Sequence, residues 1–263
     1  MLPVNLSTLE RFKLAKDCGF EQIECPTTPN QAQAEAMKDA SEKVGLPIHS
    51  VMNMDHWKYP FTSADPAVVE TGLAGARTSI RNAHLWGAST VLLVPGVVNP
   101  ATGYQDAYVR SQTAIRSLIP LAEELNVTLA IEEVWNKFLL SPIEFANYID
   151  EYKSARVRAY FDVGNVVLYG YPQDWIRTLG PRIAKLHIKD FAFVRGRNGG
   201  DSVVRWVSPG EGDIDWTGVY QALRDIGYQG TATLELPPGD EAYLKDMRAR
   251  FSTILAGDMH HGA

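Results

Sequence analysis

Short apolar runs with strand character alternate with segments of helical periodicity along this chain. The run STVLLVPG at residues 89–96 is typical, because its β-branched and aliphatic side chains favour a strand and its unbroken apolar character indicates burial on both faces. Comparable runs predict seven strands, at residues 20–25, 46–52, 89–96, 127–134, 157–164, 182–188 and 231–236. Strands that alternate with helices are typical of a parallel sheet.

The segments between these runs carry the start and stop residues of helices. Pro66 lies in the first turn of one helix and Gly87 at its end, while Ser141 is expected to cap another helix ahead of Pro142. One helix ends at Gly19, and a second, which follows turn residues from Pro26 on, ends at Gly45. Further helices are predicted at residues 65–87, 103–126, 141–152, 171–180, 215–227 and 239–256.

The spacing of these elements predicts an α/β fold, a (β/α)8 TIM barrel formed by one domain over residues 1–263. Eight units in 263 residues give about 33 residues each, the length expected of a βα unit. Only residues 1–5 are available for a first strand, which is therefore expected to be short or missing. An open doubly wound sheet is the alternative, although the chain lacks the GxGxxG turn of dinucleotide-binding folds. The insertion 191–213 is expected to form a hairpin beside the exit of strand 182–188.

Composition and charge exclude several classes of partner. The net charge of -6 and the absence of a basic cluster argue against nucleic acid. No apolar stretch approaches the ~20 residues of a membrane helix, and the N-terminus lacks a charged leader with an apolar run. We therefore expect a cytoplasmic protein that does not bind membranes and whose two cysteines, Cys18 and Cys25, remain unpaired.

Four consecutive predicted strands end in a polar, titratable residue. In chain order these residues are Glu132, Asp162, His187 and Glu235. In an α/β barrel such strand ends meet at one rim, where isolated charges would be costly to bury and three carboxylates would repel one another. A divalent cation resolves both problems, and a set of oxygen and nitrogen ligands without thiolate suits Mn²⁺, Mg²⁺, Co²⁺ or Zn²⁺. Glu133 competes with Glu132, but strand alternation favours Glu132.

Other polar residues of the same rim have two readings each. Glu24 and His49 could each contact the substrate. The alternative for Glu24 is a solvated carboxylate, and the alternative for His49 is a structural histidine. Lys189 could meet a sugar oxygen or a phosphate, and Asp190 could orient a metal ligand from behind; a surface ion pair is the alternative for both. Arg197 could hold a phosphate through paired hydrogen bonds, or lie in a solvated Arg-Gly loop.

The chain resembles the sugar isomerase/epimerase superfamily of xylose-isomerase-like barrels, and within it the ketose 3-epimerases and the ribulose- or xylulose-phosphate 3-epimerases. The stretches that carry the resemblance are AIEEVWNKFLLSP, FDVGNVVLYGYPQDWI, RIAKLHIKDF, GEGDIDW and GYQGTATLEL. The resemblance implies that Glu132, Asp162, His187 and Glu235 bind a metal, often Mn²⁺, and that the two glutamates act as an acid/base pair. Two positions depart from the 3-epimerases. Asn165 stands where those enzymes have a histidine that contacts substrate, and we expect Asn165 to contact substrate here; Phe138 replaces a glutamate.

The function expected from these residues is a metal-dependent sugar or sugar-phosphate epimerase working through a cis-enediolate. An aldose–ketose isomerase would use the same groups, and so would a dehydratase of the inosose or dehydroshikimate type. A barrel-fold endonuclease would need a histidine-rich cluster of several metals and a basic surface, and six histidines with a net charge of -6 disfavour it. The complete set of four ligands disfavours a non-catalytic sugar-binding subunit. We also expect a homo-dimer or tetramer, because the outer helices of barrels often pair.

Overall fold

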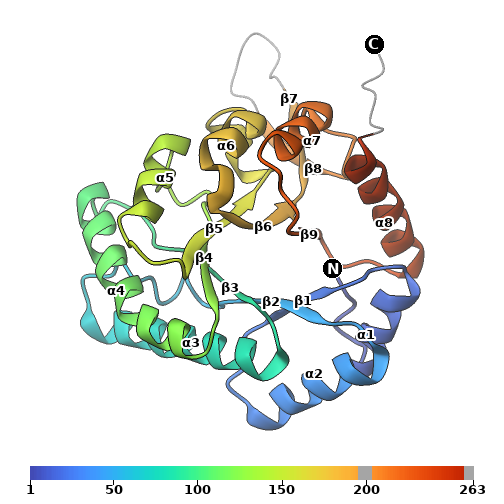
Figure 1. The fold of residues 1–263 in the computed structure, drawn as a ribbon, viewed down its shortest axis with the longest axis horizontal. Helices are drawn as coiled ribbons and strands as arrows, with labels where there is room; N and C mark the ends of the chain where they lie inside the picture. The colour runs from blue at the N-terminus through green and yellow to red at the C-terminus, as the bar shows by residue number, and fades with distance from the viewer. Residues whose placement is uncertain (195–202, 258–263) are drawn as a thin grey trace.

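Seven parallel strands form one sheet whose order follows the chain. The computed structural model describes residues 1–194 and 203–257. The strands are β1 (Ile23–Pro26), β2 (Ile48–Met52), β3 (Thr90–Leu93), β4 (Thr128–Ile131), β5 (Val157–Asp162), β6 (Ile183–Ile188) and β9 (Thr231–Leu234). Each strand pairs with its neighbour in the chain, whereas a doubly wound sheet would reverse its order part-way. The strands therefore curve around a common axis, as Figure 1 shows, and the predicted barrel is confirmed.

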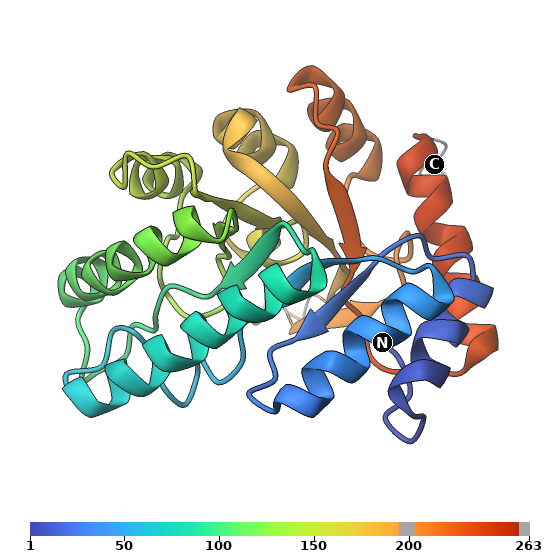
Figure 2. The ribbon, with the colours of Figure 1, turned by 60° about the horizontal axis from the view of Figure 1, so that its bottom comes forward.

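Helices surround the strands on the outside (Figures 1 and 2). In the described residues they are α1 (Thr8–Asp17), α2 (Gln31–Val44), α3 (Pro66–Trp86), α4 (Tyr104–Glu124), α5 (Pro142–Asp150), α6 (Pro172–Leu179), α7 (Trp216–Asp225) and α8 (Glu241–Ala256), with short 3-10 turns η1 (Asn165–Leu168) and η2 (Gly180–Arg182). The predicted end signals are present. The Ser141 hydroxyl accepts a hydrogen bond from Glu144 N at 3.2 Å, and Gly87 ends α3 at a φ of 70°.

The main core lies between the strands and the helices. Side chains of the strands such as Val91 and Leu129 are fully buried, and so is Ile80 of α3, which faces them across this layer. Full burial of one such side chain contributes about 1.5–3 kcal/mol to folding relative to exposure. Many such side chains together fix the strands against the helices, and with them the strand ends at the rim. Cys18 and Cys25 are both free, as expected. None of the helices in the described ranges is both long and apolar enough to cross a membrane.

The barrel has an open seam between β1 and β9. Residues 1–22, all of them described, form no strand, and β1 and β9 are not hydrogen-bonded to each other. The Thr231 hydroxyl spans the seam at one point, donating to Gln22 Oε1 at 3.1 Å. A cavity of about 290 Å³ lies along the seam, lined largely by apolar side chains of the neighbouring strands and helices. The expectation of a short or missing first strand is confirmed.

A two-stranded hairpin follows β6 at the carboxyl end of the barrel. Its strands are β7 (Asp190–Val194) and β8 (Val203–Val207), which pair antiparallel with Phe191 opposite Trp206. The hairpin predicted within 191–213 is therefore present, and it stands directly beside the strand that carries His187.

Candidate metal centre

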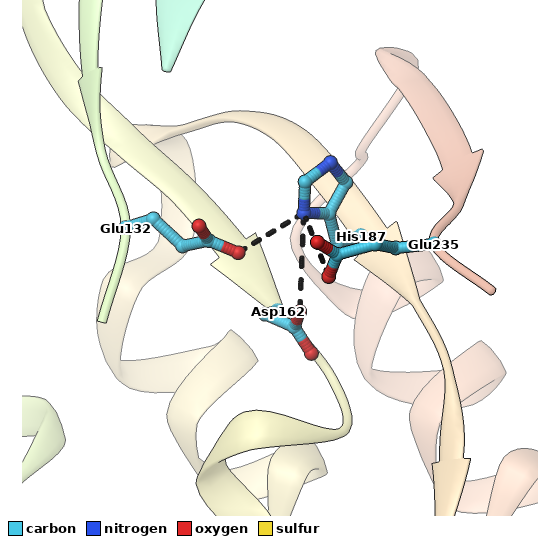
Figure 3. A group of neighbouring side chains, drawn as sticks. All are labelled: Glu132, Asp162, His187 and Glu235. Atoms are coloured by element: carbon cyan, nitrogen blue, oxygen red, sulfur yellow. Dashed lines mark hydrogen bonds and ion pairs between the residues drawn. The ribbon is translucent and has the colours of Figure 1, made fainter. Parts of the chain in front are cut away.

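The four predicted ligands converge at the carboxyl ends of adjacent strands. Glu132 follows β4, Asp162 ends β5, His187 lies in β6 and Glu235 follows β9. Parallel register brings them together, because Asp162 pairs with His187, and the backbone N–H of Glu235 continues the ladder to Ile188 O at 3.0 Å. One donor atom from each of the four residues lies within 4.8 Å of the others (Figure 3). We call these residues the four-residue cluster.

The imidazole of His187 is the centre of this cluster. Its Nδ1 lies 3.0 Å from Glu132 Oε1, 3.6 Å from Glu235 Oε2 and 3.9 Å from Asp162 Oδ2. Glu132 and Glu235 enter from opposite sides in Figure 3, since their strands flank β5 and β6. Glu132, Asp162 and His187 are buried, whereas the Glu235 side chain is 37% exposed, so the cluster is reached from the side of Glu235.

A fourth carboxylate holds the other nitrogen of the imidazole. Glu24 Oε2 lies 3.0 Å from His187 Nε2, and the hydroxyl of Tyr160 donates to Glu24 Oε1 at 2.9 Å. Both oxygens of Glu24 are thus engaged with buried protein groups, and its contact with a substrate hydroxyl stays a prediction. A carboxylate that accepts from one ring nitrogen leaves the other free for a metal, which is the usual setting of a histidine ligand.

Opposed effects set the protonation of these groups. Burial raises the pKa of Glu24, but the charge and hydrogen bond of His187 outweigh it and lower that pKa to about 2. Burial would lower the pKa of His187, yet the carboxylates of Glu24 and Glu132 raise it well above the usual value. Burial raises the pKa of Glu132 to about 7, against the opposing influence of His187.

Glu133 is buried behind the cluster and is not a member of it. Its Oε1 accepts the backbone N–H of Asp162 at 3.3 Å, and its Oε2 has no hydrogen-bond partner. Burial, together with the charges of Asp162 and Glu132, raises its pKa well above the ordinary value. Glu133 therefore supports the Asp162 backbone, while Glu132 presents its carboxylate to His187.

The donor set fits a divalent cation. Three carboxylates and one imidazole nitrogen provide oxygen and nitrogen ligands without thiolate, and donors on opposite sides of one ion are about 4–4.5 Å apart. The 4.8 Å spread of the cluster needs only a small contraction to reach that geometry. A cation already occupies part of it, because the Lys189 ammonium lies 2.5 Å from both Asp162 Oδ2 and Glu235 Oε2.

Three further predicted site residues have protein partners. The carboxylate of Asp190 accepts from the backbone N–H groups of Phe191, Gly210 and Gly212 and from the indole of Trp216, so it shapes the loop before α7. Its orientation of a metal ligand stays a prediction. The Asn165 amide donates to Glu133 O at 2.9 Å. His49 Nε2 lies 3.0 Å from the Thr233 hydroxyl inside the barrel. Arg197 lies outside the described residues.

A group of aromatic rings lies next to the cluster, and two of them, Phe191 and Trp206, were missed from the sequence. Phe191 lies between Trp206 and Trp135, with ring centroids 4.6 Å and 5.0 Å away. Both tryptophans are partly exposed, and the Lys189 ammonium lies 5.3 Å from the centroid of Trp206. The signal was present, because Phe191 and Trp206 both lie in the predicted hairpin 191–213, but only the pairing of β7 with β8 brings them together.

Comparison with known proteins agrees with this architecture. A family model described as a xylose isomerase-like TIM barrel matches residues 12–252. The chain belongs to this family. The superfamily resemblance noted above is thereby confirmed.

Relatives of the chain within the xylose isomerase-like family include sugar-phosphate epimerases. An Escherichia coli (strain K12) protein provisionally named L-ribulose-5-phosphate 3-epimerase SgbU is 28% identical over 89% of this chain and 85% of its own length. L-ribulose-5-phosphate 3-epimerase UlaE of Salmonella paratyphi A is 24% identical over 89% of this chain and 84% of its own length. The crystal structure of a D-psicose 3-epimerase in the presence of D-fructose superposes with a TM-score of 0.77, at 18% identity over 96% of this chain and 95% of that one, and shares the fold.

Proposed function

We propose that this chain is a metal-dependent ketose 3-epimerase and that its substrate is a pentulose phosphate. The observation that carries the proposal is the four-residue cluster, in which two glutamates flank one candidate cation position from opposite sides. The names of the curated relatives support the choice of reaction, because both proteins are named as L-ribulose-5-phosphate 3-epimerases. Each of them matches this chain over most of its own length.

The four residues of the cluster would hold the cation, for which we propose Mn²⁺. A divalent cation there would polarise the ketone and the hydroxyl of the neighbouring carbon, which would make the C–H of that carbon more acidic. Glu24 would keep His187 Nδ1 directed at the cluster, since it already holds Nε2 at 3.0 Å.

Glu132 and Glu235 would be the acid/base pair. Epimerisation removes a proton from one face of the carbon beside the ketone and returns a proton to the opposite face. Carboxyl groups on opposite sides of the same bound sugar meet that need, and Glu132 and Glu235 come from β4 and β9, on either side of β5 and β6. The partly exposed side chain of Glu235 is the one that solvent reaches.

The substrate would enter between Glu235 and the aromatic rings. Trp206 and Trp135 offer apolar faces to the C–H side of a sugar, and Lys189 lies between Trp206 and the cluster. We keep the prediction that Arg197 contacts the phosphate and that the protein forms a dimer or tetramer.

Isotope exchange tests the reaction directly. The protein is loaded with Mn²⁺ and incubated in D₂O with L-ribulose 5-phosphate, L-xylulose 5-phosphate and the free ketoses, and the sugars are followed by NMR. A 3-epimerase places deuterium at C3, an aldose–ketose isomerase at C1 or C2, and a dehydratase produces a new enone absorbance. Exchange at C3 that is lost in Glu235→Gln while the fold persists supports the proposal. Exchange that survives this substitution contradicts the acid/base assignment.

A further inference from the structure

Lys189 places a buried ammonium among the proposed metal ligands. The residue is 5% exposed, and its Nζ lies 2.5 Å from Asp162 Oδ2 and 2.5 Å from Glu235 Oε2. The structure makes room for its stem, because a Cβ added at Gly164 would lie 2.5 Å from Lys189 Cγ. The ammonium therefore occupies a defined place in the cluster of this structure.

A bound divalent cation and this ammonium would share the same two oxygens. An ion bound to Asp162 Oδ2 at about 2.2 Å lies within about 5 Å of Nζ in any direction, because Nζ itself is 2.5 Å from that oxygen. Like charges at this distance repel strongly in a buried site. Asp162 Oδ2 and Glu235 Oε2 would each also have to bind the metal ion and accept a hydrogen bond from the ammonium at the same time.

The ammonium already lies near an aromatic face that could hold it away from the carboxylates. The ring centroid of Trp206 is 5.3 Å from Nζ, inside the range of about 6 Å over which an ammonium is attracted to an aromatic face. The lysine stem is flexible enough to move its end group from the carboxylates further onto this ring without a change in the backbone.

We propose that Lys189 is the resident cation of the metal-free cluster and that metal binding displaces its ammonium toward Trp206. The inference rests on the proposed metal site. In the metal-free protein the ammonium offsets repulsion between Asp162 and Glu235, and in the metal-bound protein it lies at the edge of the substrate space. Lys189 is thus a positioning residue that competes with the metal for two of its ligands.

Titration with Mn²⁺ tests the competition. Metal-stripped wild type, Lys189→Met and Lys185→Met are compared by calorimetry, with the apparent melting temperature of each recorded without and with Mn²⁺. Lys185 is the matched control, because it is a buried lysine of β6, four residues before Lys189, whose ammonium donates to the Thr231 hydroxyl instead. We expect Lys189→Met to bind Mn²⁺ at least about tenfold more tightly than wild type does. Without the ion its melting temperature should be lower than that of wild type, and the rise in melting temperature on adding Mn²⁺ should be larger.

Different failures overturn different claims. If wild type binds one Mn²⁺ and Lys189→Met binds it equally or more weakly, the competition is refuted and the metal site stands. If neither protein binds Mn²⁺, both are refuted.

A crystal structure of the wild type with Mn²⁺ provides a test that needs no variant. The inference predicts Nζ beyond ion-pair distance of Asp162 Oδ2. An ion in the cluster with Nζ still between Asp162 and Glu235 overturns it.

Discussion

Glu24→Gln tests whether a buried carboxylate prepares His187 to bind metal. The substitution keeps the shape of the side chain and removes its charge. In the structure Glu24 accepts from Tyr160 at 2.9 Å and lies 3.0 Å from His187 Nε2, with its side chain only 6% exposed. An amide oxygen at the same place still accepts a hydrogen bond, but it no longer favours electron donation through the ring to Nδ1.

Loss of such a partner typically lowers metal affinity 10- to 100-fold. This corresponds to about 1.4–2.7 kcal/mol of binding free energy. The assay is a Mn²⁺ titration of metal-stripped Glu24→Gln, with kcat and KM measured at saturating metal. Glu21→Gln is the control, because this neighbouring glutamate is 86% exposed and forms a long ion pair with Arg248 at 3.7 Å. Unchanged Mn²⁺ affinity together with a raised KM would refute the orienting role and restore a substrate contact for Glu24.

Two further predictions follow from buried carboxylates. Because the folded pKa of Glu24 is about 2 against an ordinary 4.5, its contribution to stability is present above pH 4.5 and is lost as the pH falls toward 2. Urea unfolding at a series of pH values should show that the free energy of unfolding falls by about 3 kcal/mol less in Glu24→Gln than in wild type as the pH is lowered from 4.5 toward 2. An equal fall in both proteins would contradict this role of Glu24. Asp190→Ala leaves four buried or partly buried N–H donors without their acceptor and should lower unfolding stability by about 2–4 kcal/mol. A melting temperature equal to that of wild type would show that the loop before α7 does not depend on this carboxylate.

Local pattern was sufficient for the barrel and for the four-residue cluster. Alternating strands and helices with clear end residues, such as Ser141 and Gly87, fix the order of the elements. Parallel register then brings successive strand ends to one rim, so a titratable residue at each end is enough to predict that they meet. The shortage of residues before the first clear strand likewise predicted a short or missing first strand, and the structure has an open seam between β1 and β9 at that place.

Roles that depend on a distant partner could not be predicted. The hydrogen bond from His187 to Glu24 joins residues 163 positions apart across the barrel, and nothing near Glu24 in the sequence indicates it. Asp190 is adjacent to the site in the chain, yet its carboxylate turns toward Gly210 and Gly212, because their N–H groups converge on it. Lys189 was expected to meet substrate, and only its distances to two carboxylates show that it meets the proposed ligands first.

The central claim is that one divalent cation binds among the side chains of Glu132, Asp162, His187 and Glu235. Anomalous X-ray scattering at the manganese edge, from crystals of wild-type protein grown with Mn²⁺, measures this directly. The account predicts one strong peak at about 2–2.3 Å from His187 Nδ1 and from the carboxylate oxygens. Diffraction data without a peak in this cluster, or with the only ordered ion elsewhere, would contradict it.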